Sequence, residues 1–260
     1  MQAQKAVIGI AVVLFLVIAG LFYHFVLHPE PAAVPVAAPE APEIAPVGQA
    51  ANPMDKTPPP PRISLPDLNE SDELVRRYLS ACSDDRDFRH WIQVSDLIRR
   101  FVAAVDNIAH GNSPASHLSI LNISRPFETK GEGGRLTIDP ASFQRFDRVV
   151  SVFLSLRTDR LRSLFHDLEP LFDDALRELG YPEKAFKETL WEAMAHLLAT
   201  PVPNLPIAVE KKLITYTLVD AHLESLTPAQ KHLIRMGPQH IRRVQEQTKK
   251  IARELDLWER

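Results

Sequence analysis

The sequence predicts a mainly α-helical globular domain with a small β-hairpin, preceded by one transmembrane helix and a proline-rich linker. Three observations lead to this fold class. Residues 6–27 form an apolar run without formal charge, 11 prolines fall between residues 29 and 61, and apolar residues recur at helical spacing from residue 66 onward. The expected divisions are a cytoplasmic N-terminus (1–5), a transmembrane helix (6–27), a disordered Pro/Ala-rich linker (28–65) and the globular domain (66–260).

The apolar run AVIGIAVVLFLVIAGLFYHFVL is long enough to span a membrane. About 20 apolar residues cross the roughly 30 Å of hydrocarbon in a bilayer. The apolar core of a secretory signal peptide is shorter, about 7–15 residues. Lys5 precedes the run, whereas residues 29–55 contain acidic residues and no Lys or Arg. The positive-inside rule therefore places the N-terminus in the cytoplasm and the domain, in a bacterium, in the periplasm.

The linker is expected to be extended and without regular structure. Proline fixes φ and removes a backbone donor, so neither a helix nor a sheet continues through such a tract. The run Pro58-Pro59-Pro60-Pro61 favours polyproline II. A stalk that holds the domain away from the bilayer is the favoured interpretation, and a docking motif for an SH3-like partner is the alternative.

Apolar periodicity and capping residues predict the helices of the globular domain in order. Asn69 or Ser71 begins a short helix to about Ala81, and Gly180 ends a long helix in which Pro170 should kink or divide the chain. The remaining expected helices span residues 91–108, 140–154, 182–200 and 228–236, followed by a last helix after Gly237-Pro238. Two segments favour strands: residues 120–138, a hairpin with a glycine-rich tip, and Leu213–Val219.

The last helix carries two distinct stripes. An apolar stripe includes Ile241, Val244, Thr248, Ile251, Leu255 and Trp258. It spans fewer than three heptads, so docking on the chain's own domain is favoured over a coiled coil between chains. The other faces carry the candidate interaction residues Arg242, Arg243, Lys249, Lys250 and Arg253. A solvated surface is the favoured interpretation, and a contact for an acidic partner or anionic lipid is the alternative.

The composition excludes several classes of chemistry. The single Cys82 excludes an internal disulfide and a cysteine-built metal site. The formal net charge of −3 is not typical of a nucleic-acid-binding protein. The sequence contains no nucleophile elbow, P-loop, dinucleotide fingerprint or His-Glu-x-x-His motif. We therefore expect no cofactor, no metal, no nucleic-acid partner and no recognisable catalytic residue.

Polar residues interrupt two of the apolar helix faces, and such groups need partners if they are buried. These candidates are Arg99, Arg100, Asp106, Asn107, Arg145 and Asp147. A structural salt-bridge network is the favoured interpretation, and an interaction or active site is the alternative.

Five blocks of sequence resemble an uncharacterised bacterial family, domain of unknown function 3014. The blocks are LIRRFVAAVDNIAHG (97–111), DPASFQRFD (139–147), LEPLFDDALRELGYP (168–182), LLATP (197–201) and LTPAQKHLIRMGP (226–238). The resemblance covers essentially all of residues 66–260 and implies a membrane span, a proline-rich stretch and one domain. It implies no activity, cofactor or catalytic residue.

The anchor, the stalk and the absence of a catalytic motif together predict a function in the bacterial envelope. We expect a single-pass inner-membrane protein that presents a periplasmic helical interaction or scaffold domain to a protein partner. The alternative is a hydrolase-like envelope enzyme whose active site carries no recognisable motif.

Overall fold

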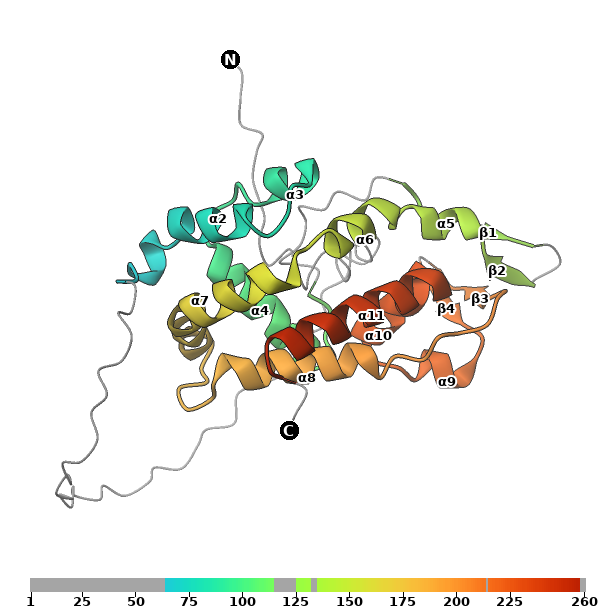
Figure 1. Cartoon of the computed structure of the whole chain (residues 1–260). Helices are drawn as coiled ribbons and strands as arrows, with labels where there is room; N and C mark the ends of the chain where they lie inside the picture. The colour runs from blue at the N-terminus through green and yellow to red at the C-terminus, as the bar shows by residue number, and fades with distance from the viewer. Residues whose placement is uncertain (1–63, 115–124, 132–134, 214, 258–260) are drawn as a thin grey trace, which may run out of the picture.

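A computed structural model describes residues 64–114, 125–131, 135–213 and 215–257 (Figure 1). The predicted transmembrane helix (6–27) and nearly all of the predicted linker (28–65) lie outside these residues. Within the described part of the chain, no helix is both long enough and apolar enough to cross a bilayer. The described residues are mainly helical, as predicted, and carry one small antiparallel sheet.

Helices occur throughout the described part of the chain. They are η1 (Leu68–Glu70), α2 (Asp72–Ser80), α3 (Arg86–Trp91), α4 (Leu97–Ala109), α5 (Pro140–Gln144), α6 (Asp147–Leu154), α7 (Thr158–Glu178), α8 (Phe186–Leu198), α9 (Ala221–Glu224), α10 (Pro228–Met236) and α11 (Pro238–Glu254). The strands are β1 (Thr129–Lys130), β2 (Leu136–Ile138), β3 (Ala208–Lys211) and β4 (Tyr216–Leu218). The strands lie between α4 and α5 and between α8 and α9.

The continuous helix predicted over residues 91–108 is wrong, because α3 ends at Trp91 and α4 begins at Leu97. Asp96, just before α4, has a left-handed backbone with φ of 59°. The carboxylate of Asp72 in α2 accepts hydrogen bonds from the N–H groups of Asp96 (2.9 Å) and Leu97 (3.0 Å). These bonds satisfy donors that a continuous helix would have paired internally, so a side chain from α2 stabilises the break.

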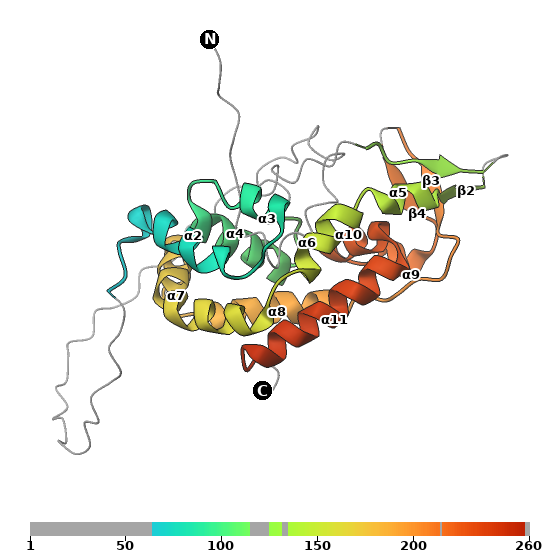
Figure 2. The same cartoon turned by 45° about the horizontal axis from the view of Figure 1, so that its top comes forward.

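Two other helix boundaries also differ from the prediction. The helix expected over 140–154 is divided into α5 and α6. The next helix begins at Phe186 instead of Pro182, and the Asp173 carboxylate of α7 accepts a hydrogen bond from the Phe186 N–H at 2.8 Å. Pro170 lies inside α7 without dividing it, and Figures 1 and 2 show the two parts of α7 running in different directions. Of the two outcomes expected at Pro170, α7 therefore shows the kink and is not divided.

The four strands form one antiparallel sheet in the order β1-β2-β3-β4. The predicted hairpin is confirmed for its described part, in which Thr129 pairs with Ile138. The strand predicted within 213–219 is also confirmed, since Tyr216–Leu218 forms β4. Its partner β3 was not predicted. Figures 1 and 2 show the sheet at the end of the molecule opposite α2 and α7.

The buried apolar residues form one core cluster, and α11 is part of it. α4 packs against α7 and α8, while α11 packs against α6, α7, α8 and α10. Within the apolar stripe of α11, Ile241 and Val244 are fully buried, and Ile251 and Leu255 are also in the core. Trp258 lies outside the described residues. The last helix therefore docks on its own domain, as the favoured interpretation held.

Candidate functional site

The structure does not bring the six polar candidates together into one network. Arg99 and Arg100 lie near the start of α4, and Asp106 and Asn107 lie near its end. Arg145 and Asp147 lie around the turn between α5 and α6. The six residues therefore belong to separate environments.

Arg99 forms the strongest polar contact at the start of α4. Its Nε and Nη2 atoms donate to the two carboxylate oxygens of Glu178 at 2.6 and 2.9 Å, and Nη2 also donates to Asn69 Oδ1 at 2.7 Å. The hydrogen bond from Arg99 lowers the pKa of Glu178. Arg100 instead donates to the Ser95 carbonyl at 3.0 Å. These contacts join α4 to the end of α7, next to Leu179, a half-exposed apolar residue.

A second environment surrounds Asp106 at the end of α4. Asp106 Oδ1 lies 3.3 Å from Nδ1 of His110, and the rings of His110 and Tyr181 stack with centroids 6.1 Å apart. Burial, with the charge and hydrogen bond of Asp106, raises the pKa of the Tyr181 hydroxyl. Asn107 donates to the Ala103 carbonyl one turn back, at 2.7 Å. Because this hydrogen bond stays within α4, Asn107 is not part of a polar site shared between helices.

Arg145 belongs to a group of basic residues that we call the basic cluster: Arg145 together with Lys231, His232 and Arg235 of α10. The Arg145 guanidinium lies over the rings of Phe127 and Phe146, 5.3 and 4.7 Å from their centroids. Its Nε atom is buried and has no hydrogen-bond partner among the described residues. Burial, and the neighbouring charge of Arg235, lower the pKa of Arg145 to about 10.

Burial also lowers the pKa values of two α10 members of the basic cluster, Arg235 and His232. Burial lowers the pKa of Arg235, and the charge of Glu224 opposes that shift. Burial, followed by the charges of Arg235, Lys231 and Arg145, holds the pKa of His232 well below its ordinary value. Lys231 donates to Glu224 Oε1 at 2.9 Å. The cluster thus concentrates positive charge between the α5–α6 turn, α10 and strand β4.

Asp147 does not pair with Arg145. Its carboxylate lies 2.9 Å from Nε2 of His240, a buried residue of α11 whose Nδ1 lies 2.9 Å from the Met236 carbonyl oxygen. The sequence indicated a polar role for Asp147 but gave no sign of this partner. The contact joins the first turn of α6 to the first turn of α11.

The basic residues of α11 are all exposed. Lys250 pairs with Glu246 at 3.0 Å. Among the described residues, no carboxylate lies within ion-pair distance of Arg242, Arg243 or Lys249. At about 100° of rotation per residue, all five cations fall within an arc of about 120°, which lies opposite the buried stripe. Because the apolar stripe of α11 is buried and the five cations lie on the opposite side, the cationic face of α11 is exposed to solvent.

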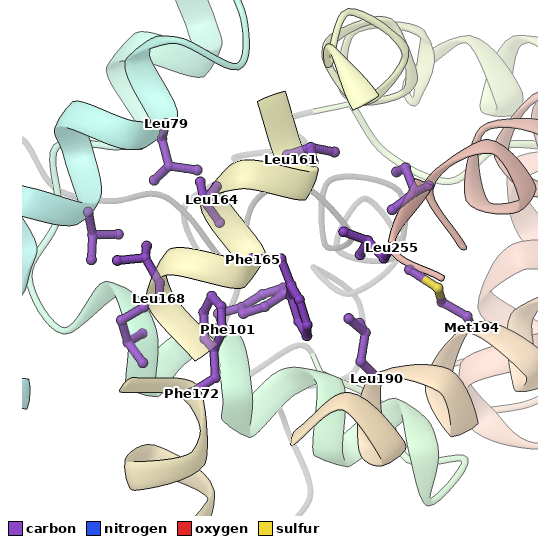
Figure 3. A pocket seen from close by; sticks show the side chains of 13 residues that line it. Leu79, Phe101, Leu161, Leu164, Phe165, Leu168, Phe172, Leu190, Met194 and Leu255 are labelled. Carbon is purple, nitrogen blue, oxygen red and sulfur yellow. The ribbon is translucent and has the colours of Figure 1, made fainter. Parts of the chain in front are cut away.

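Figure 3 shows a partly open apolar pocket of about 50 Å³ between α2, α4, α7, α8 and α11. Figure 3 shows side chains from these helices directed towards it, including Phe101, Phe165, Phe172, Leu190, Met194 and Leu255. The rings of Phe101 and Phe172 meet edge to face with centroids 5.5 Å apart. A space of this size, with no polar group at its wall, is a packing defect of the core and does not fit a substrate.

Metal and cysteine chemistry find no support in the described part of the chain. There, no three His, Cys, Asp or Glu residues lie close enough to hold a metal ion. Glu192, which lies one turn before His196 in α8, pairs with Lys184 at 2.6 Å. Cys82 is fully buried, and its burial raises the pKa of its thiol to about 12. The thiol therefore stays protonated at neutral pH and is a poor nucleophile.

Sequence reasoning missed Phe127, His232 and Arg235 as neighbours of Arg145. A partial signal existed, because three basic or titratable residues fall within the one helix predicted over residues 228–236. No local pattern joins residue 145 to residue 235. Only the packing of α10 against α5 brings them together.

Comparison with known proteins places the chain in a family. A family model described as a protein of unknown function (DUF3014) matches residues 97–252. No curated protein and no solved structure gives a significant match. The matched segment extends from the first residue of α4 into the last turns of α11, includes the basic cluster, and covers more than half of the chain. The chain therefore belongs to the DUF3014 family of proteins of unknown function.

Proposed function

We propose that this chain is a single-pass inner-membrane protein whose helical domain lies in the periplasm and binds an acidic protein partner through the exposed face of α11. The observation that carries the proposal is the division of α11 into two faces. Its apolar side is buried in the domain's own core, and the cations Arg242, Arg243, Lys249, Lys250 and Arg253 are exposed on the other side.

A docked helix presents its charged face in a fixed orientation, which lowers the entropic cost of binding. Complementary charge steers association and suppresses binding of partners with like charge. The apolar run at 6–27 and the proline-rich stretch after it support a domain held at a distance from the bilayer. Together these features favour a scaffold or accessory subunit of an envelope assembly.

The enzyme alternative has less support from the described residues. A hydrolase of envelope polymers needs a polar pocket with acids whose pKa values suit proton transfer. The acids with a clear shift, Glu178 and Glu224, both have lowered pKa values and are engaged in ion pairs with Arg99 and Lys231. The cavity in Figure 3 has apolar walls. These observations favour binding over catalysis.

The proposed interface is tested with a photo-crosslinking residue at position 243 of the full chain in intact membranes, and at position 86 as the control. Arg86 is an exposed cation at the start of α3, far from α11 in sequence. We expect crosslinks at position 243 to an acidic segment of a protein, lost in the double variant Arg242→Glu/Lys249→Glu and kept in Arg86→Glu/Lys211→Glu. Crosslinks to phospholipid, or equal crosslinking in both double variants, would show that the proposed interface is wrong.

The orientation is tested separately with reporters fused after Arg260. A phosphatase that is active only after export should be active, and a fluorescent protein that folds only in the cytoplasm should stay dark. The reverse pattern would contradict the periplasmic location without bearing on the α11 interface.

A further inference from the structure

The basic cluster of Arg145, Lys231, His232 and Arg235 contains more positive charge than its surroundings neutralise. Three of its members, Arg145, Lys231 and Arg235, carry charge at neutral pH, and Glu224 is the acid that acts on Lys231 and Arg235. Glu224 is already engaged, since Oε1 lies 2.9 Å from Lys231 Nζ and Oε2 accepts a hydrogen bond from the Leu218 N–H at 2.8 Å. No second carboxylate is paired with Arg145 or Arg235 among the described residues.

Arg145 is the least compensated of these cations. It is part-buried, its Nε lacks a hydrogen-bond partner, and the neighbouring charge that acts on it is another cation, Arg235. The faces of Phe127 and Phe146 offset part of the lost hydration through cation–π contacts. Aromatic faces do not supply the hydrogen-bond acceptors that the guanidinium N–H groups require. The arrangement leaves the Arg145 guanidinium held in place and without a counter-ion in the described part of the chain.

Arg235 contacts the backbone of the same group of aromatic residues. One of its Nη atoms donates to the Tyr216 carbonyl oxygen at 3.4 Å, a long hydrogen bond. The Tyr216 ring contacts the Phe127 ring, with centroids 5.3 Å apart, and Arg145 lies over that same Phe127 ring. Arg235 is also part-buried, so both guanidinium groups belong to residues that solvent can reach.

We propose that the basic cluster is a binding site for one oxyanion, the carboxylate or phosphate group of a small ligand, with Arg145 as its main donor and Arg235 as the second. A planar guanidinium presents paired N–H donors that match the oxygens of a carboxylate or phosphate. Unpaired buried cations are costly, and an anion that neutralises them recovers that cost. The site has two arginines at one place and no extended basic strip, which suits a single anionic group.

The proposal is tested by thermal unfolding of the full chain in a mild non-ionic detergent. Sodium phosphate and sodium acetate are compared with sodium chloride at equal ionic strength and pH. A ligand that binds only the folded state raises Tm with its concentration. We expect phosphate, acetate or both to raise the Tm of the wild-type chain above its value in chloride. The anion that gives the larger rise distinguishes a phosphate ligand from a carboxylate ligand.

Arg145→Met removes the main donor and should weaken anion binding at least about tenfold. Arg148→Met is the matched control, because Arg148 is a neighbouring exposed arginine that already pairs with Asp85 at 2.7 Å. The control should keep the anion-dependent rise in Tm even if its baseline Tm is lower. If Arg145→Met fails to fold, Arg235→Lys is used in its place. This variant keeps the positive charge but loses the paired N–H donors of the guanidinium, so it should reduce the anion-dependent rise in Tm.

Two results would overturn the proposal. One is a wild-type Tm that rises no more in phosphate or acetate than in chloride at equal ionic strength. The other is an anion-dependent rise that persists unchanged in Arg145→Met, or in Arg235→Lys where that variant is used. Neither result bears on the α11 interface, because Arg145 and Arg235 lie outside the exposed face of α11.

Discussion

Nε2 of His240 lies 2.9 Å from a carboxylate oxygen of Asp147, so a buried ring of α11 is held by an exposed acid of α6. Nδ1 of the same ring lies 2.9 Å from the Met236 carbonyl oxygen at the end of α10. Both neighbours are acceptors, so a ring nitrogen of His240 that carries a hydrogen donates to the acceptor next to it. One side chain thereby joins the ends of three helices.

Asp147→Ala should lower the free energy of unfolding by about 0.5–1.5 kcal/mol, because one of the two acceptors of a buried donor is lost. Asp147→Asn keeps an acceptor oxygen and should cost less. Urea unfolding followed by circular dichroism measures the difference. Glu246→Ala is the control, since it removes an exposed i,i+4 ion pair with Lys250 and should change stability by no more than about 0.5 kcal/mol. Equal losses in the two alanine variants would contradict a structural role for the His240 contact.

Gly237→Ala should destabilise the domain more than Gly180→Ala. Both glycines have positive φ, 87° and 99°, so alanine is strained at each position, at a cost of about 1–3 kcal/mol. A Cβ atom at Gly237 would also lie 2.7 Å from Cγ of Phe143, whereas nothing lies within 4 Å of one at Gly180. Thermal unfolding should therefore give the lower Tm for Gly237→Ala. Equal Tm values would mean that Phe143 moves aside freely.

Two of the boundaries that sequence reasoning placed correctly have a side-chain cap close by in the chain. Asp139 accepts a hydrogen bond from the Ala141 N–H at 2.8 Å. Thr227 and Gln230 form a reciprocal capping box at the start of α10. In each case the residue that ends the loop also satisfies the first helical donors, so the signal is readable without knowledge of the fold.

Two of the boundaries that sequence reasoning placed wrongly depend on caps from distant residues. Asp72 supplies acceptors for the start of α4, and Asp173 supplies one for the start of α8. Apolar periodicity continues across residues 91–97, so it gives no sign of the break there. The candidate site follows the same rule: proximity in sequence suggested that Arg145 and Asp147 belong together, while their actual neighbours, Arg235 and His240, are set by tertiary packing.

The free energy of unfolding should fall as the pH drops below about 6.5. Burial, with the neighbouring cations, holds the pKa of His232 well below its ordinary value of 6.5, and burial also lowers the pKa of His196. The unfolded chain therefore takes up protons in this range that the folded chain does not, so stability is lost as the pH decreases. The lowered pKa values of Glu178 and Glu224 produce a further loss only below their ordinary value of 4.5.

His232→Gln should reduce the slope of stability against pH between about pH 6.5 and 5, by up to about 1.4 kcal/mol per pH unit. His166→Gln is the control, because the His166 side chain is 85% exposed and its replacement should leave the slope unchanged. Urea unfolding at a series of pH values measures both. A slope that is the same in His232→Gln as in the wild type would contradict a neutral, buried His232.

Ile241→Ala and Arg242→Ala test the two faces of α11 at adjacent positions. Ile241 is fully buried in the core, and its truncation should cost about 2–5 kcal/mol of stability. Arg242 is exposed on the opposite face, and its truncation should change stability by no more than about 0.5 kcal/mol. Urea unfolding of both variants measures the contrast.

Truncation after Gly237 extends the same test to the whole helix. It removes Ile241, Val244, Ile251 and Leu255 from the core, and burial of each large apolar side chain contributes about 1.5–3 kcal/mol. The summed loss is comparable to a typical net stability of about 5–15 kcal/mol, so the truncated chain should be unfolded. Circular dichroism and light scattering distinguish the outcomes. A truncated chain that stays folded but becomes monomeric, from an oligomeric parent, would make α11 an interchain contact and would contradict its docking on its own domain.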